Sequence, residues 1–150
     1  MAHTGDVLSI RHTCVVPDPS EDERGLLQFL MEAGESLQTR PVLIPTNDAF
    51  LLFMSKNSDA LSKYYDFNVA DYPTVMTLVS KRMQYEYAQS QGISIPRTLY
   101  PSNVPIEEIA REMSYPCIIK PCFSHLWRKF LSATWETRDS GIEIFDSPRI

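Results

Sequence analysis

The chain has 150 residues and a mass of 17.2 kDa, which is the size of one domain, or of one domain and part of a second. Hydrophobic residues make up 43% of it and charged residues 22%, a balance typical of globular proteins and too apolar for intrinsic disorder. The net charge of −5 argues against a nucleic-acid-binding module, which needs clustered lysine and arginine. Neither a secretory signal nor an apolar run of the roughly 18 residues that cross a bilayer is evident. We therefore expect a cytoplasmic protein without a membrane or nucleic-acid partner.

Cysteine and glycine usage excludes several kinds of site. The three cysteines, Cys14, Cys117 and Cys122, are too few and too odd in number for a disulfide framework, so we expect reduced thiols. A zinc site at Cys117, Cys122 and His125 lacks the fourth ligand of structural zinc, and a Cys122 nucleophile beside His125 lacks an orienting acid. With 5 glycines against 11 prolines, neither common glycine-rich phosphate loop occurs. We assign no metal ligand, and the catalytic residues stay unknown.

The first part of the chain predicts a small α/β unit. Residues 14–16 and 41–45 are apolar runs typical of short buried strands. Between them, residues 20–34 carry apolar side chains at helical intervals, with Ser20 at capping-box spacing and Gly34 at the expected end of the helix. A strand, a helix and a strand in this order imply a right-handed parallel crossover.

The later elements are predicted from helical spacing and from prolines. Residues 64–69 weakly indicate a strand, and residues 73–92 a helical stretch that bends near Ser80. Residues 106–113 have the clearest helical spacing of the chain, and residues 117–121 follow as a short strand between two prolines. The sequence beyond this strand has no period that we can follow.

Two lysines stand where a positive charge is unusual. Lys120 closes an apolar strand, where its ammonium group must reach solvent or meet an anion. From spacing alone, a strand-end lysine that extends into water is the commoner explanation. Lys81 lies near the start of a helix, whose N–H groups and dipole favour anions, and its neighbour Arg82 doubles the charge. For Lys81, an anion site and an exposed helix face explain the pattern about equally well.

The loop after Lys120 carries groups that can donate hydrogen bonds to a phosphate. Residues 123–129 combine hydroxyl, imidazole and guanidinium side chains, among them Ser124 and His125. The same residues are also compatible with an ordinary surface turn.

Three segments together resemble the ATP-grasp superfamily, and within it the predicted carboxylate–amine ligases related to the carbamoyl-phosphate synthase large chain. They are PVLIPTNDAF at residues 41–50, SKRMQYEYAQSQGISIPRT at 80–98, and IEEIAREMSYPCIIKP at 106–121. The second and third segments follow the family's order of a lysine that opens a helix, Gly-Ile-x-x-Pro, a helix, and a Tyr-Pro-x-x-x-Lys-Pro strand.

The resemblance implies an α/β fold class with two incomplete parts. Residues 1–72 would be a partial Rossmann-like pre-ATP-grasp domain that lacks its opening strand. Residues 73–131 would be the start of an α+β ATP-grasp lobe, and residues 132–150 an irregular tail. In that family two lobes grip ATP between them, so this chain would be the N-terminal portion of a longer ligase.

The resemblance also implies cofactors and a reaction. Lys81 and Lys120 match the two lysines that contact the nucleotide phosphates in relatives, and Ser124 and His125 would line the following loop. The implied cofactors are ATP and Mg²⁺, with the magnesium ligands outside this chain. The implied chemistry is phosphorylation of a carboxylate by ATP and attack of an amine on the acyl phosphate. We expect an ATP-binding half-site that is inactive alone, with a nucleotide and a small-molecule carboxylate and amine as partners of the whole protein.

Two other interpretations stay open. The chain could be a non-catalytic α/β binding or interaction module, or an unrelated α/β domain whose lysines only solvate its surface. A fragment would expose the apolar face that its missing lobe covers, and this face would allow self-association.

Overall fold

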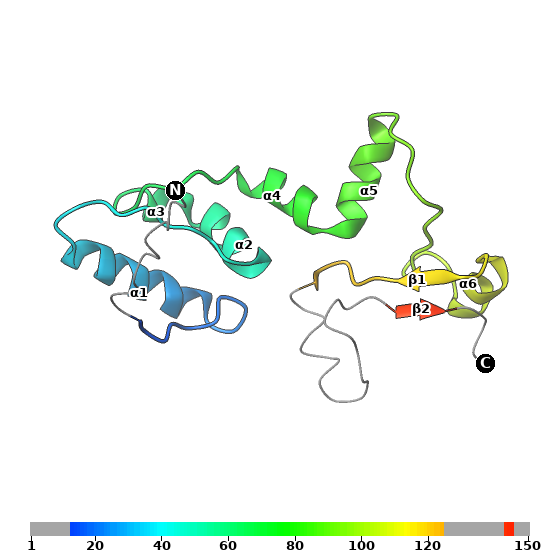
Figure 1. Cartoon of the computed structure of the whole chain (residues 1–150), viewed down its shortest axis with the longest axis horizontal. Coiled ribbons are helices and arrows are strands. Elements are labelled where there is room, and N and C mark those ends of the chain that lie inside the picture. Colours follow the sequence, from blue (N-terminus) through cyan, green and yellow to red (C-terminus); the bar gives the residue numbers. More distant parts are fainter. Residues whose placement is uncertain (1–12, 125–142, 146–150) are drawn as a thin grey trace, which may run out of the picture.

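The computed structural model describes residues 13–124 and 143–145, which are mainly helical (Figure 1). The helices are α1 (Glu23–Ser36), α2 (Asp48–Lys56), α3 (Ser58–Leu61), α4 (Tyr72–Val79), α5 (Lys81–Ser90) and α6 (Ile106–Glu112). The strands β1 (Cys117–Ile119) and β2 (Glu143–Phe145) form an antiparallel pair in which Ile118 lies opposite Ile144. None of the helices in these two ranges is both long and apolar enough to cross a membrane.

The α/β fold class predicted from the sequence is wrong. Residues 14–16 form no strand, and residues 41–45 contribute only an isolated parallel bridge between Val42 and Asp66. Two backbone hydrogen bonds of 2.9 and 3.0 Å flank this bridge. Val42 is 68% exposed and Ile44 is 72% exposed, whereas a parallel sheet is covered on both faces. The described residues therefore show neither a Rossmann-like domain nor the start of an ATP-grasp lobe.

Several individual elements were nevertheless predicted correctly. The helices expected over residues 20–34 and 106–113 are confirmed as α1 and α6, and the bent helical stretch over 73–92 is confirmed as α4 and α5. The strand expected over 117–121 is the shorter β1. The strand β2 lies within residues 132–150, which were expected to be irregular.

The start of α1 differs from the predicted capping box. Asp22 caps the helix, because its Oδ1 accepts a hydrogen bond of 2.8 Å from the backbone N–H of Gly25. Ser20 lies before the helix, and its backbone N–H donates to Oδ1 of Asp18 at 2.7 Å. An aspartate two residues further along the chain therefore takes the role predicted for the serine.

Gly34 lies inside α1 and does not end it. The helix continues to Ser36, and Leu37 closes it by donating its backbone N–H to the carbonyl of Gly34 at 3.2 Å. A Cβ atom added to Gly34 would lie 2.5 Å from Cβ of Tyr64. The glycine is therefore needed for the close approach of α1 to the chain that follows α3.

The hydrophobic core lies among the first four helices. One cluster joins α1, α2, α3 and the residues just after α3, and its members are Leu26, Phe53, Met54, Leu61 and Tyr65. Helix α4 adds buried Val75 and Val79. Neither α5 nor α6 contains a buried residue. Apolar burial therefore stabilises the N-terminal helices, and the later elements depend more on polar contacts.

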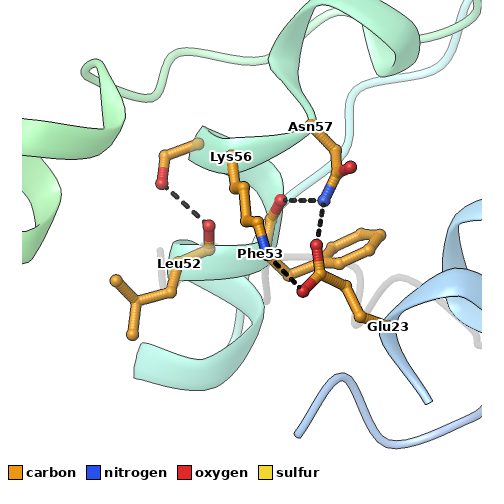
Figure 2. A network of polar contacts seen from close by, with 6 residues as sticks. Glu23, Leu52, Phe53, Lys56 and Asn57 are labelled. Carbon is orange, nitrogen blue, oxygen red and sulfur yellow. Dashed lines mark hydrogen bonds and ion pairs between the residues drawn. The ribbon is translucent and has the colours of Figure 1, made fainter.

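A polar network joins the start of α1 to the end of α2 (Figure 2). Nζ of Lys56 lies 2.7 Å from Oε2 of Glu23. The side-chain amide of Asn57 donates to Oε1 of Glu23 at 3.1 Å and to the carbonyl of Phe53 at 2.9 Å. The hydrogen bond from Lys56, followed by that from Asn57, lowers the pKa of Glu23 below its ordinary value.

Replacing Glu23 with glutamine is expected to lower the free energy of unfolding by about 0.5–1 kcal/mol at neutral pH, because the ion pair is partly exposed. The pKa of Glu23 is lower in the folded chain than in the unfolded chain. Its stabilising contribution is therefore complete above the unfolded value and is lost as the pH falls through the folded value. Urea unfolding followed by circular dichroism at neutral pH and near pH 3 measures both effects.

Glu107→Gln is the matched control, because Glu107 is exposed on α6 and forms no ion pair with the described residues. A difference between Glu23→Gln and the wild-type chain that stays the same from neutral to acidic pH would contradict the role of the charge.

Candidate anion-binding site

Ser80 forms the joint between α4 and α5. It is 3% exposed, and its backbone N–H donates to the carbonyl of Met76 at 2.9 Å, which closes α4. Its hydroxyl oxygen accepts a hydrogen bond of 3.4 Å from the backbone N–H of Met83, which caps α5. One extended residue thus ends one helix and begins the next, and the chain turns between α4 and α5 (Figure 1). Lys81 is the first residue after this turn.

The first turn of α5 contacts the chain segment that follows β1. The backbone N–H of Lys81 donates to the carbonyl oxygen of Cys122 at 2.9 Å. Two extended residues span at most about 7 Å, so the Cα atom of Lys120 lies within that distance of the Cα atom of Cys122. The structure therefore brings the backbone at Lys81 close to the segment that carries Lys120, although the two residues lie on different elements.

Neither lysine is neutralised by a carboxylate within the described ranges. Lys120 is exposed, and Lys81 is half-buried with its Nζ atom 3.4 Å from Oε1 of Gln84. The four ion pairs found among the described residues involve neither of them. Lys81 thus places an ammonium group without an ion-pair partner among the described residues at the start of α5, and Lys120 lies on the neighbouring segment, so an anion there would be favoured.

The backbone at the start of α5 offers one further donor. The first N–H groups of a helix have no partner within the helix. Here the N–H of Lys81 donates to the carbonyl oxygen of Cys122, and the N–H of Met83 donates to the hydroxyl oxygen of Ser80. The N–H of Arg82 has no acceptor among residues 13–124. The start of α5 thus offers the ammonium group of Lys81 and the N–H of Arg82, two kinds of donor that suit phosphate oxygens.

The other two predicted site residues lie further along the segment that follows β1. Ser124 is exposed in the segment that carries Lys120 and Cys122. His125 lies outside the described residues. Within the described ranges, no three histidine, cysteine, aspartate or glutamate side chains gather where they could hold one metal ion. The cations and the N–H group at the start of α5 do not suit Mg²⁺, which prefers oxygen ligands, so we assign it no ligand here.

The side chain of Arg82 has a different role from the one expected from the sequence. Its Nε atom lies 2.8 Å from Oε1 of Glu86, one helical turn along α5. Its Nη1 atom donates to the hydroxyl oxygen of Ser102 at 3.0 Å, and its Cζ atom lies 5.0 Å from the centre of the Tyr100 ring. The charge of Arg82 is therefore matched by Glu86. The i, i+4 spacing of this pair is visible in the sequence, whereas the contacts with Tyr100 and Ser102 have no local signal.

A shallow groove of about 340 Å³ lies elsewhere on the surface, along α1. Its lining residues within the described ranges are Arg24, Leu27, Gln28, Met31, Glu32 and Glu35. All of them belong to one helix, and their charges are of both signs. The groove is therefore the open flank of α1, and it contains none of the predicted site residues.

Comparison with known proteins identifies no relative of this chain. No protein-family model matches it, and neither the search of curated proteins nor that of solved structures finds a match.

Proposed function

We propose that the start of α5 and the segment after β1 bind the polyphosphate of a nucleotide such as ATP, with Lys81 and Lys120 as the cations that contact it. The observation that carries the proposal is the 2.9 Å hydrogen bond from Lys81 to Cys122. It brings together two segments, each with a lysine that has no ion-pair partner among the described residues. The exposed hydroxyl of Ser124 can donate to the same anion. His125 is proposed as a fourth contact on the basis of the sequence alone.

The reaction class we propose is the ATP-dependent joining of a carboxylate to an amine. The sequence resemblance supports it, with Lys81 and Lys120 at the positions of the phosphate-contacting lysines. The fold does not contribute to this part of the proposal, because the described residues are mainly helical. When bound, Mg²⁺ would neutralise the negative charge of the polyphosphate. This chain's own part is to hold the phosphates, and we propose that it is inactive without further residues.

A second candidate function is a non-catalytic interaction module, which could associate with a second copy of the chain. It is favoured by isoleucines that remain exposed on α6 and β1: Ile106 is 66% exposed, Ile118 51% and Ile119 50%. Isolated exposed apolar residues are common in monomers, whereas a contiguous patch marks an interface. A chain that dimerises but does not bind ATP would favour this second function over the first.

Protection of Cys122 from thiol reagents tests the nucleotide proposal. Cys122 is exposed, and its carbonyl contacts Lys81, so a polyphosphate bound there would hinder access to the thiol. We expect ATP to slow modification of Cys122 at least threefold, measured by mass spectrometry of the peptide that contains it. Cys14 is also exposed and serves as the internal control, since it lies on another part of the chain.

Adenosine is the matched ligand control, because it lacks the phosphates. We expect it to protect Cys122 little or not at all. Equal modification rates with and without ATP, or equal protection of Cys14 and Cys122, would contradict a phosphate site beside Lys81.

A further inference from the structure

Arg82 connects α5 to the chain just before α6. Its guanidinium group donates to Ser102 at 3.0 Å and lies over the ring of Tyr100 at 5.0 Å. On α5, Oε1 of Glu86 lies 2.8 Å from Nε of the same guanidinium group. A guanidinium group combines a planar face for stacking with fixed donor directions, so these three contacts together specify one orientation.

Two separate segments therefore meet the first turn of α5. Residues 100–102 are held by the side chain of Arg82, and Cys122 is held by the backbone of Lys81. Helix α6 and strand β1 lie between these two points of the chain. The two contacts thus attach both ends of the stretch from residue 100 to residue 122 to the first turn of α5.

Apolar packing contributes little to this attachment. Helices α5 and α6 contain no buried residue, and both isoleucines of β1 are half exposed. Burial is the main cause that raises the pKa of Tyr100; the charge of Glu86 raises it further and that of Arg82 lowers it. The Tyr100 ring lies against the guanidinium group of Arg82 on α5. The position of Lys120 relative to Lys81 therefore depends on a few polar contacts.

We propose that Arg82 is a positioning residue, which holds residues 100–102 on α5 and thereby keeps the segment of Lys120 beside Lys81. The expected effect of Arg82 on ATP binding rests on the proposed function. Whether Arg82 holds residues 100–102 on α5 can be measured without a nucleotide. The opposite possibility is that Arg82 contacts the phosphates directly. The two roles predict different effects when the partners of Arg82 are removed.

The first experiment is amide hydrogen exchange by NMR on the chain without ATP. The amide proton of Lys81 reports the hydrogen bond to Cys122. We expect Arg82→Ala and Ser102→Ala to speed its exchange at least threefold while the amide of Leu61, in the core, keeps its wild-type rate. Arg111→Ala is the matched control, since Arg111 lies on α6 and donates only to the carbonyl of Glu107 within the described residues. Unchanged exchange of Lys81 in both variants would overturn the proposal.

The second experiment is ATP affinity by titration calorimetry for Arg82→Ala and Ser102→Ala. A positioning role predicts that both variants weaken binding several-fold. A direct phosphate contact predicts that Ser102→Ala leaves binding unchanged or strengthens it, because it frees Arg82, and that result would overturn the proposal. If the wild-type chain fails to bind ATP, the proposed function fails, and the exchange of the Lys81 amide alone decides whether Arg82 holds the segment in place.

Discussion

Replacing Lys81 or Lys120 with alanine is expected to weaken ATP binding about tenfold each. A hydrogen bond to a charged group contributes about 1.5–3 kcal/mol, and 1.4 kcal/mol corresponds to a factor of ten in the dissociation constant. Lys120 is exposed and Lys81 is half-buried, so screening by water places both effects at the lower end of that range. Titration calorimetry with ATP and Mg²⁺ measures them.

The double variant distinguishes one shared anion from two independent effects. If both lysines contact the same polyphosphate, the loss in the double variant will differ from the product of the two single losses. Lys63→Ala is the matched control, because Lys63 is exposed and also forms no ion pair with the described residues. A loss of affinity in Lys63→Ala equal to that in Lys81→Ala would mean that only net charge matters, which would contradict a specific site.

Replacing Leu61 with alanine is expected to lower the free energy of unfolding by about 2–5 kcal/mol. Leu61 is 0% exposed and packs in the cluster formed by the first three helices. Truncation leaves a cavity beside Leu26 and Tyr65, and α3 is too short to be stable without its packing. Urea unfolding followed by circular dichroism measures the loss.

Ile106→Ala is the control for core position, because Ile106 is 66% exposed on α6. We expect this substitution to change the free energy of unfolding by less than about 0.5 kcal/mol. Similar losses for Leu61→Ala and Ile106→Ala would mean that α6 belongs to the same cooperative core, in contradiction to the distribution of buried residues described here.

The helices could be predicted from the sequence because their signals are local. The spacing of apolar residues predicts α1 and α6, and a bend is predicted near Ser80, whose side chain caps α5 in the structure. The prediction that Gly34 ends α1 was wrong because it also rested on a local pattern. A glycine near the end of a helical pattern predicts a terminus, whereas the close approach of Tyr64 that explains it is a tertiary contact.

The lack of a parallel sheet among the described residues could not be predicted from strand patterns alone. Residues 41–45 are apolar and both begin and end with a proline, a pattern that fits a buried strand as well as an extended segment with one bridge. Only the number of partner strands distinguishes the two cases, and a partner is not visible in a local pattern. The same limit applies to the site. The unusual positions of Lys81 and Lys120 can be seen in the sequence, but the hydrogen bond to Cys122 that joins their segments is long-range.

The most direct test of the proposed phosphate site uses an ATP analogue with an acyl group on its terminal phosphate. A lysine amine that contacts the phosphates attacks the acyl carbon, forms an amide and releases the nucleotide. Mass spectrometry then locates the modified lysines. We predict modification of Lys81 and Lys120 that is prevented by excess ATP, with Lys63 modified slowly and without competition. Equal modification of all three lysines, or labelling of Lys81 and Lys120 that excess ATP does not reduce, would contradict the account.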